Sequence, residues 1–314
     1  MKTICILSAH SSDVDAIIST SLNIKYLSEI SDKIVIINSK EFSESDPLKE
    51  DILKRHKDID IEYHYCANLN SLCHGKWCFY VDNFYKHDYD NVILTNDSFI
   101  VVDSLKNVLD LHNNKDANMT GLVSSREQKW HCQDFFRIYN KKSLKSVITF
   151  YKRSITVGGL IEDVSILDKK RFIDSYHVCV KAEIESCQQF SNIECYYMLP
   201  LSYKKNIHFD NDMLKEYLEN KNYPVVKNKK IKFTCYDKLY DKLPEDFDAF
   251  SYLECNSDLP FNQKKQLEGH FMNHGQKEGR MYYKGQELIL PKYLQPYVGE
   301  FLNEKQVYQN TKHQ

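Results

Sequence analysis

The stretch VILTNDSFIVVDSL, residues 92–105, decides the fold. It begins as an uncharged apolar run, stops at Asn96, Asp97 and Ser98, and then turns apolar again. An uncharged run rich in β-branched residues is typical of a strand buried inside a sheet. The amide, carboxylate and hydroxyl at its end leave three interpretations open: a plain turn, an N-glycosylation acceptor, or the rim of an active site.

Similar apolar runs alternate with helical patterns over about the first 150 residues. Strands are predicted at 2–9, 33–39, 59–66, 91–97, 119–125 and 130–140. Helices are predicted at 14–30, 75–87, 102–114 and 142–154. This alternation favours an α/β fold with a parallel-rich sheet flanked by helices.

Three of the predicted strands end in small polar residues. The sets are Ser8, Ala9 and His10; Asn38 and Ser39; and Asn96, Asp97 and Ser98. Turn chemistry would explain any one of them. In open parallel sheets, however, ligands bind outside the carboxyl ends of the strands, so the three sets together indicate one shared cleft.

Composition narrows the classes of function. The chain has 314 residues, 42% of them hydrophobic, and a net charge of -2, which gives no electrostatic case for a nucleic-acid partner. No run approaches the length of a membrane span, and the N-terminus does not read as a signal peptide. A soluble, cytoplasmic protein is expected. In that compartment the glycosylation sequons at Asn96 and Asn118 carry no meaning.

The ten cysteines are irregularly spaced, which favours free thiols over a disulfide framework. One cluster could in principle bind zinc: His64, Cys66, Cys73, His74 and Cys78. It contains no CxxC pair and straddles a strand-to-helix junction, so half-buried cysteines are the preferred interpretation. Dinucleotide, P-loop, hydrolase-elbow and HExxH signatures are absent from the sequence.

A domain boundary is expected near 235–247. It would separate a domain at 1–235 from a small helical accessory module at 245–314, whose polar end from 303 onward is expected to fray. Within this module His270 and His274 lie one helical turn apart. Without an obvious third ligand, we expect them to serve packing or capping rather than metal binding.

Asp97 is the clearest candidate for a metal-binding residue. A carboxylate that follows a central strand, flanked by small polar residues, is how α/β glycosyltransferases of the GT-A type hold a divalent metal. Such an ion neutralises the diphosphate that leaves when the sugar departs, and Mn²⁺ and Mg²⁺ prefer hard oxygen ligands.

Four ordered segments carry a resemblance to one family. They are YDNVILTNDSFIV (89–101), WHCQDFFRIYNKKSL (130–144), VKAEIESCQQF (180–190) and NIHFDNDMLKEYLENKNYPVVKNK (206–229). Their order resembles the rhamnan-synthesis-F-like glycosyltransferases, which include bacterial polysaccharide enzymes and a domain of a large chlorella-virus protein. The resemblance covers roughly 1–235 and implies a GT-A-like, Rossmann-like mixed sheet. The C-terminal YLECNSDL…HFMNHGQKEGRMY resembles a short helical repeat that accompanies glycosyltransferases in giant viruses.

The chain departs from that family's pattern at four places, one of which is the His block, where Asn206-Ile207-His208 replaces Asn-x-x-His. Asp134 stands where the family has Ser, and Gly75-Lys76-Trp77 replaces a Gly-x-Asp segment, which alters a sugar contact at Lys76. The family's Pro-Phe-Ile-Lys block has become Pro224-Val225-Val226-Lys227.

The resemblance implies a role for each matching residue. Asp97 and His208 would bind the metal, while Asn96, Ser98 and Lys227 would contact the diphosphate. The nucleotide would lie along Ser8, Ala9 and His10, and the sugar against His131, Gln133 and Lys76. Glu183 is the first candidate for the base that deprotonates the acceptor hydroxyl, followed by Asp134 and Asp163.

The expected function is therefore transfer of a hexose, such as rhamnose, from a nucleotide-diphosphate sugar to a glycan or other hydroxyl acceptor. The expected reaction is metal-dependent and inverting, and would take place in a host cytoplasm or a virion if the chain is viral. Protein contact would fall to the C-terminal module. Two alternatives stay open: a non-catalytic sugar- or protein-binding module on the same fold, and a nucleotidyltransferase, which would also need a metal-binding carboxylate.

Overall fold

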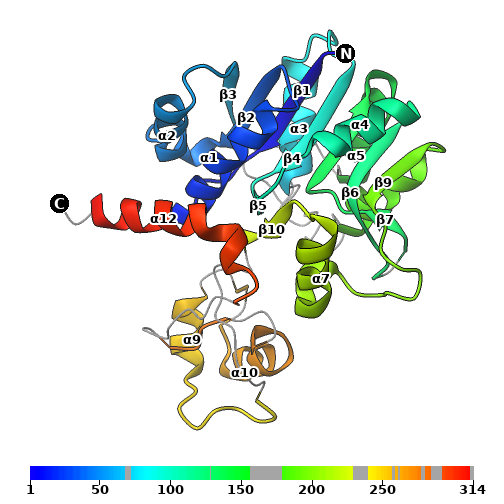
Figure 1. Ribbon diagram of the computed structural model, residues 1–314. Helices are drawn as coiled ribbons and strands as arrows, with labels where there is room; N and C mark the ends of the chain where they lie inside the picture. Colours follow the sequence, from blue (N-terminus) through cyan, green and yellow to red (C-terminus); the bar gives the residue numbers. More distant parts are fainter. Residues whose placement is uncertain are drawn as a thin grey trace.

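The computed structural model describes residues 1–67, 72–127, 129–155, 179–228, 240–256, 259–260, 262–276, 280–283 and 292–311. Its centre is a mixed sheet of order β3-β2-β1-β4-β8-β6-β7, with β9 paired to β6 (Figure 1). The strands are β1 Thr3–Ser8, β2 Lys33–Ser39, β3 Ile61–Cys66, β4 Asn91–Asn96, β6 Met119–Ser125, β7 His131–Cys132, β8 Phe136–Asn140 and β9 Ile193–Tyr197. Strands β1 to β4 are mutually parallel, and β8 runs antiparallel between β4 and β6. The predicted α/β fold is confirmed.

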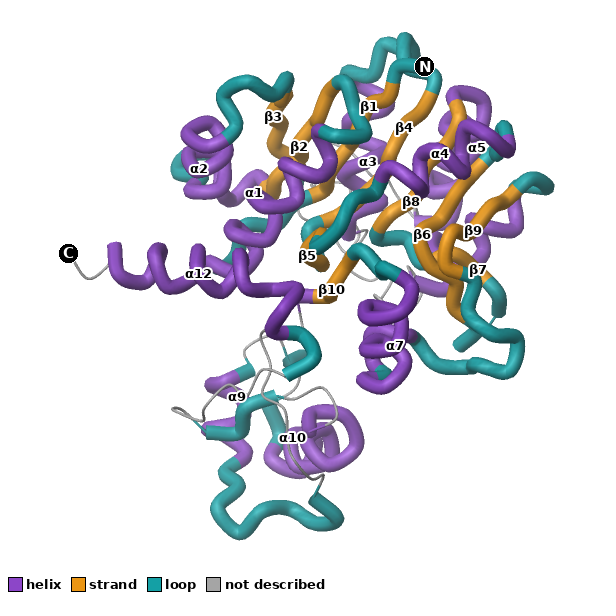
Figure 2. The backbone as a smooth tube through the Cα atoms, viewed as in Figure 1, coloured by secondary structure: helices purple, strands orange, loops and turns teal. Residues whose placement is uncertain are grey.

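Helices cover both faces of the sheet (Figure 2). They include α1 Val14–Ser28, α2 Pro47–Arg55, α3 Leu72–Asn83, α4 Lys106–Lys115, α5 Lys141–Ile155 and α7 Asn211–Lys221. Side chains of a strand alternate between faces, and this alternation separates two cores. Cys5 and Leu7 of β1 pack with α1, α2, α4 and α7, whereas Ile4 and Ile6 pack with α3 and α5. Because the central strands are buried on both faces, they read as continuous apolar runs.

A second, two-stranded sheet follows the end of β4. Strand β5, Phe99–Val101, pairs antiparallel with β10, Val225–Lys227. The sequence predicted neither strand, and it extended a helix back to residue 102, whereas α4 begins at Lys106. This ladder matters for function because it joins chain segments that are far apart in sequence.

The strand predicted at 130–140 is interrupted. Strands β7 and β8 are separated by residues 133–135, whose backbone makes other contacts. The Asp134 amide donates to the Glu183 carboxylate, and the Phe135 carbonyl accepts from Asn96 N–H and the Thr95 hydroxyl. The break therefore turns this segment toward the end of β4.

The chain beyond residue 240 forms a small helical unit with its own core and a last helix that packs on the main domain. Helices α9 (Ala249–Cys255) and α10 (Lys264–His270), with the turn η6 (Phe271–Gly275), enclose their own small core around Tyr252 and Phe271. His270 Nδ1 lies 2.8 Å from the Tyr252 hydroxyl, within that core. Within the described residues, no helix combines the length and apolar character needed to cross a membrane.

The last helix, α12 (Gln295–Thr311), packs on α1 instead (Figure 1). The expected frayed tail is thus helical as far as Thr311. Val298 and Phe301 of this helix, and Leu294 just before it, are buried in the same core as α1. Two ion pairs flank this contact: Glu304 with Arg55 at 2.7 Å, and Lys305 with Asp15 at 2.9 Å. The narrow apolar stripe of α12 is not evident from its mostly polar sequence.

We expect Phe301→Ala to lower the free energy of unfolding by about 3 kcal/mol, because it opens a cavity between α12 and α1. Val307→Ala is the matched control on the same helix. Its side chain is 58% exposed, so the expected change is below about 0.5 kcal/mol. Urea unfolding followed by circular dichroism measures both. Equal effects of the two substitutions would mean that α12 is not docked in solution.

Candidate functional site

The polar ends of β1, β2 and β4 converge at one edge of the sheet. The backbone N–H of His10 donates to Asp97 Oδ2 at 2.6 Å, and His10 Nδ1 lies 2.7 Å from Ser39 Oγ. Lys76 extends from α3 into the same place, where Nζ donates to the Ala9 carbonyl at 2.5 Å and to Ser39 Oγ at 2.7 Å. Adjacent parallel strands place their carboxyl ends side by side, so the three polar sets lie together at one edge of the sheet.

Burial disfavours the charged forms of both Asp97 and Lys76. Burial raises the pKa of the Asp97 carboxyl, although the His10 N–H and the Lys76 ammonium partly counter it. Burial likewise lowers the pKa of Lys76, against the pull of Asp97. Burial therefore disfavours the charged form of the Asp97 carboxyl, and Lys76 and the His10 N–H offset this only in part. A hard divalent cation would relieve that condition, so the donor type fits the metal that the sequence predicts.

Asn96 and Ser98 shape the turn that presents Asp97. Asn96 Oδ1 accepts from Ser98 N at 3.1 Å and from Ser98 Oγ at 2.6 Å. Lys227, at the end of β10, donates from Nζ to Ser98 Oγ at 2.7 Å and lies 4.0 Å above the Phe135 ring. The Lys227 ammonium group is thereby held in place beside the turn. A glycosylated Asn96 would have to break these contacts.

Asn228, which directly follows β10, makes two further contacts with this turn. The Asn228 amide donates to the Asp97 carbonyl at 2.7 Å, and its backbone N–H donates to the Ser98 carbonyl at 3.0 Å. Ser8, the last residue of β1, is buried next to this edge. The segment after Pro224 therefore contacts the turn that carries Asp97.

His208 lies in a buried aromatic setting. It belongs to the turn η5 (Ile207–Phe209), with Nε2 3.2 Å from the Tyr223 hydroxyl and its ring 5.4 Å from that of Phe135. Phe135 is the ring that also carries Lys227. Gln133 donates to Asn206 Oδ1, which in turn caps the His208 N–H. His208 is thus part of the same neighbourhood, with its Nε2 directed at Tyr223.

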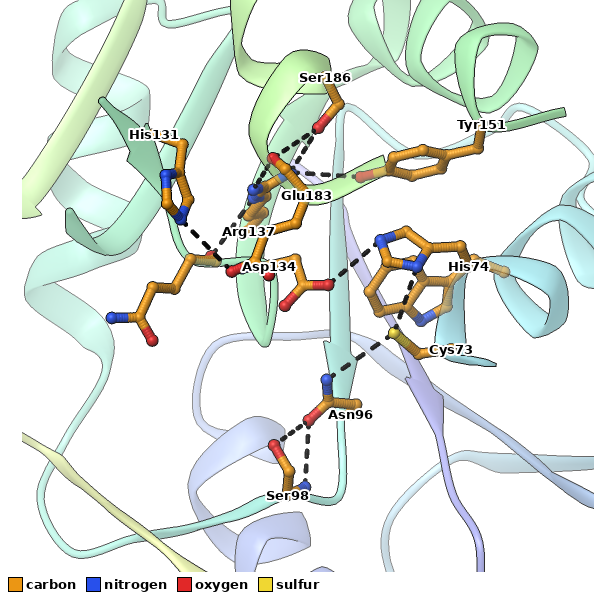
Figure 3. A network of polar contacts seen from close by, with 12 residues as sticks. Cys73, His74, Asn96, Ser98, His131, Asp134, Arg137, Tyr151, Glu183 and Ser186 are labelled. Atoms are coloured by element: carbon orange, nitrogen blue, oxygen red, sulfur yellow. Dashed lines mark hydrogen bonds and ion pairs between the residues drawn. The ribbon is translucent and has the colours of Figure 1, made fainter. Parts of the chain in front are cut away.

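Figure 3 shows a second polar network. It surrounds the segment between β7 and β8. His131 Nε2 lies 3.6 Å from Glu183 Oε1, and the same oxygen accepts from Asp134 N–H at 3.4 Å. The Asp134 carboxylate pairs with His74 Nε2 at 3.2 Å. The structure therefore places both described candidate bases, Glu183 and Asp134, next to each other. The third, Asp163, lies outside the described residues.

The two carboxylates differ in their partners. Burial favours protonation of Asp134, but His74 and Arg137 outweigh it and hold the pKa of Asp134 well below its usual range. Burial disfavours a charged His131, yet its bond with Glu183 prevails and raises the pKa of the imidazole. A carboxylate with so low a pKa is a weak base, which favours Glu183 over Asp134 for proton transfer.

Sequence reasoning missed Arg137, which is fully buried and organises this network. Its guanidinium donates to the Glu183 carbonyl at 2.7 Å, to Ser186 Oγ at 2.8 Å and to the Gln133 carbonyl at 3.3 Å, and also to the Cys132 carbonyl. An arginine inside a predicted strand was the available signal, because a charged residue there needs partners.

Arg137→Met should lower the free energy of unfolding by about 3 kcal/mol, because it leaves several buried carbonyl and hydroxyl groups without donors. Arg55→Met is the control. It removes two ion pairs at a partly exposed site, so the expected loss stays under about 1 kcal/mol. Urea titration of both variants gives the comparison. A loss for Arg137→Met no larger than the control would show that water satisfies those groups.

The zinc cluster considered from the sequence is divided in the structure. His64 pairs with Glu62 at 2.5 Å and packs on Phe84, while Cys66 and Cys78 are buried. Across the described part of the chain, one group of three such ligands lies within 4.8 Å: Cys73, His74 and Asp134. No sequence pattern links Asp134 to Cys73 and His74.

No protein-family model matches the chain, and no curated protein matches it. Two solved structures are similar over 63% of the chain. HddC from Yersinia pseudotuberculosis matches over 91% of its own length, with 10% identity and a TM-score of 0.38. A putative glucose-1-phosphate thymidylyltransferase from Bacillus anthracis, in complex with a sucrose, matches over 87% of its length, with 9% identity and a TM-score of 0.39. At these values the likeness carries no functional argument.

Proposed function

We propose that the protein is a glycosyltransferase that moves a hexose from a nucleotide-diphosphate sugar to a hydroxyl acceptor. One observation carries the proposal. Three of the segments that resemble the rhamnan-synthesis-F-like family, 89–101, 130–144 and 206–229, meet at the turn around Asp97, and the fourth, 180–190, contacts Asp134. Up to 131 residues separate contacting partners such as Asp97 and Asn228. Scattered segments with merely structural roles have no reason to gather at one sheet edge.

The donor would lie along the converged strand ends. Asp97 and His208 would hold a Mn²⁺ or Mg²⁺ ion, which supplies neutralisation of the departing diphosphate. Lys227 is a point charge held by Ser98 and Phe135, suited to a phosphate oxygen. His10 follows β1, and Lys76 reaches from α3 to the ends of β1 and β2, where a nucleotide would be bound at the carboxyl edge.

Glu183 would take the proton of the acceptor hydroxyl on its carboxylate. Asp134 N–H orients that carboxylate, and His131, whose Nε2 lies 3.6 Å from Glu183 Oε1, would stabilise its charge until the acceptor arrives. Gln133 and His131 border the same space and would contact sugar hydroxyls. A base placed opposite the leaving group is the arrangement that an inverting transfer needs.

A nucleotidyltransferase is the second candidate, because the buried ammonium of Lys76 against Ala9 and Ser39 would also suit a triphosphate. A panel assay separates the candidates. Metal-dependent release of UDP, GDP or dTDP from nucleotide sugars supports the glycosyltransferase, whereas pyrophosphate release from nucleoside triphosphate with a sugar phosphate supports the alternative. Absence of release and of any thermal shift with nucleotides would leave a non-catalytic binding module and overturn the proposal.

A further inference from the structure

Cys73, His74 and Asp134 bring three metal-binding side chains together close to the end of β4 (Figure 3). Their sulfur, ring nitrogen and carboxylate oxygen all lie within 4.8 Å of one another. Cys73 Sγ is 3.8 Å from His74 Nδ1, and Asp134 Oδ2 is 3.2 Å from His74 Nε2. The thiol and the carboxylate therefore lie on the same side of the imidazole, and the three groups converge on one place.

The spacing of these groups fits a small cation. Zinc binds cysteine sulfur at about 2.3 Å and histidine nitrogen or carboxylate oxygen at about 2.0–2.2 Å, so tetrahedral ligand atoms are about 3.3–3.8 Å apart. His74 Nε2 and the Asp134 oxygen, 3.2 Å apart, are already close to that spacing. Cys73 is partly exposed, so its sulfur is free to move the short way that remains.

The Nε2 atom of His74 is the feature that calls for a ligand. It is buried and makes no hydrogen bond, because its contact with Asp134 lacks the alignment that a hydrogen bond needs. When the ring is neutral with its proton on Nδ1, Nε2 turns a lone pair toward that carboxylate. Two electron-rich atoms that meet without a proton inside the protein are costly, and a cation between them removes the cost.

The imidazole is also held in a fixed orientation. His74 is 1% exposed, and its ring packs edge-on against Trp77 at 5.1 Å and against Tyr151 at 4.7 Å. The Asn96 side-chain amide donates to the Cys73 sulfur at 3.9 Å, the kind of outer hydrogen bond that orients a metal ligand. Two of the three ligands therefore have neighbours that position them.

The chemistry of the donors selects zinc. Cysteine sulfur and imidazole nitrogen favour Zn²⁺, whereas Mg²⁺ and Mn²⁺ prefer oxygen ligands. This set therefore differs in kind from the carboxylate of Asp97, which suits a hard ion. Three protein ligands leave the fourth tetrahedral position to water, which can reach the partly exposed Cys73.

We propose that Cys73, His74 and Asp134 bind one zinc ion, which ties the start of α3 to the segment between β7 and β8. On binding, a zinc–sulfur bond forms and the thiol proton of Cys73 passes to solvent. The inference does not rest on glycosyl transfer, because the ion acts on the structure and is separate from the cation at Asp97.

The test is zinc titration of the intact chain after a chelator has removed bound metals. Excess Mg²⁺ is present, because it occupies oxygen-ligand sites without competing for sulfur. Elemental analysis after gel filtration should find about one zinc per chain. The melting temperature should rise with zinc, since an ion that binds only the folded chain stabilises it. Cobalt(II) in place of zinc should show thiolate-to-metal charge-transfer absorption, which reports a sulfur ligand directly.

Cys73→Ser should weaken zinc binding by at least about 100-fold and abolish the charge-transfer absorption. Cys255→Ser is the matched control, because Cys255 is the other partly exposed cysteine among those the structure describes. It should bind zinc as the unsubstituted chain does. Asp134→Asn should weaken binding by more than about tenfold, and if it does not fold, Cys73→Ser at its partly exposed position decides the test.

A chain that retains no zinc would leave His74 and Asp134 as an ordinary ion pair and overturn the proposal. Zinc that Cys73→Ser retains in full would also overturn it, because the ion would then be bound elsewhere. So would a cobalt complex without charge-transfer absorption, since the sulfur would not be a ligand. None of these readouts depends on transfer activity, so a failure of the proposed function is distinguished from a failure of the zinc site.

Discussion

Asp97→Asn should reduce metal-dependent release of nucleoside diphosphate by about 10²- to 10³-fold, the usual loss when one preorganised charge contact to a transition state is removed. The substitution keeps an acceptor oxygen for the His10 N–H, so the turn should survive. What is lost is the negative charge that a divalent cation requires. Initial rates across a Mn²⁺ titration measure the effect.

Asp90→Asn provides the control for this experiment. Asp90 precedes the opposite end of the same strand, β4, where it accepts from the Lys2 N–H at 2.8 Å. It should retain full activity and the same metal dependence. If Asp97→Asn keeps full metal-dependent turnover, the assigned metal site is wrong even where the class of enzyme is right.

Glu183→Gln should lower kcat for transfer to the acceptor by about 10²- to 10⁴-fold, because it removes the proposed base. The amide oxygen can still accept from Asp134 N–H, so the network around it should stay folded. Binding of the nucleotide should not change, since Glu183 lies on the acceptor side. Transfer rates together with nucleotide titration by calorimetry separate these two effects.

Glu185→Gln is the control for Glu183. It lies two residues further on, in the 3-10 turn η4 (Glu185–Gln189), and should keep normal transfer. Full transfer by Glu183→Gln together with loss in Asp134→Asn would assign the base to Asp134.

Much of the sheet could be predicted because its central strands are uncharged apolar runs bounded by polar residues. β2 and β6 begin and end where the sequence predicts, and β1 and β4 agree within a residue or two. Convergence of their polar ends followed from parallel order alone. The sequence could not reveal β5, since three residues carry no periodic signal, nor α12, whose few buried apolar side chains stand among many polar ones.

The site was predictable in its residue types but not in its pairings. Asp97 and Lys227 could be chosen as candidates from chemistry and motif order. The contact of His74 with Asp134 joins α3 to the segment between β7 and β8, and only the folded chain brings them together. Arg137 escaped notice because its partners are mostly backbone carbonyls, which leave no trace in a sequence.

The β5–β10 ladder has a consequence for biosynthesis. Ser98 and Lys227 are 129 residues apart, so a ribosome adding about 10 residues per second delivers the second strand on the order of 10 s after the first. During that interval β5 has an unpaired edge, which is open to pairing with other chains. A message truncated before codon 225 would yield a sheet that folds around an incomplete turn at Asp97. Synthesis of the C-terminal third is thus the step that commits the nascent chain to a finished site.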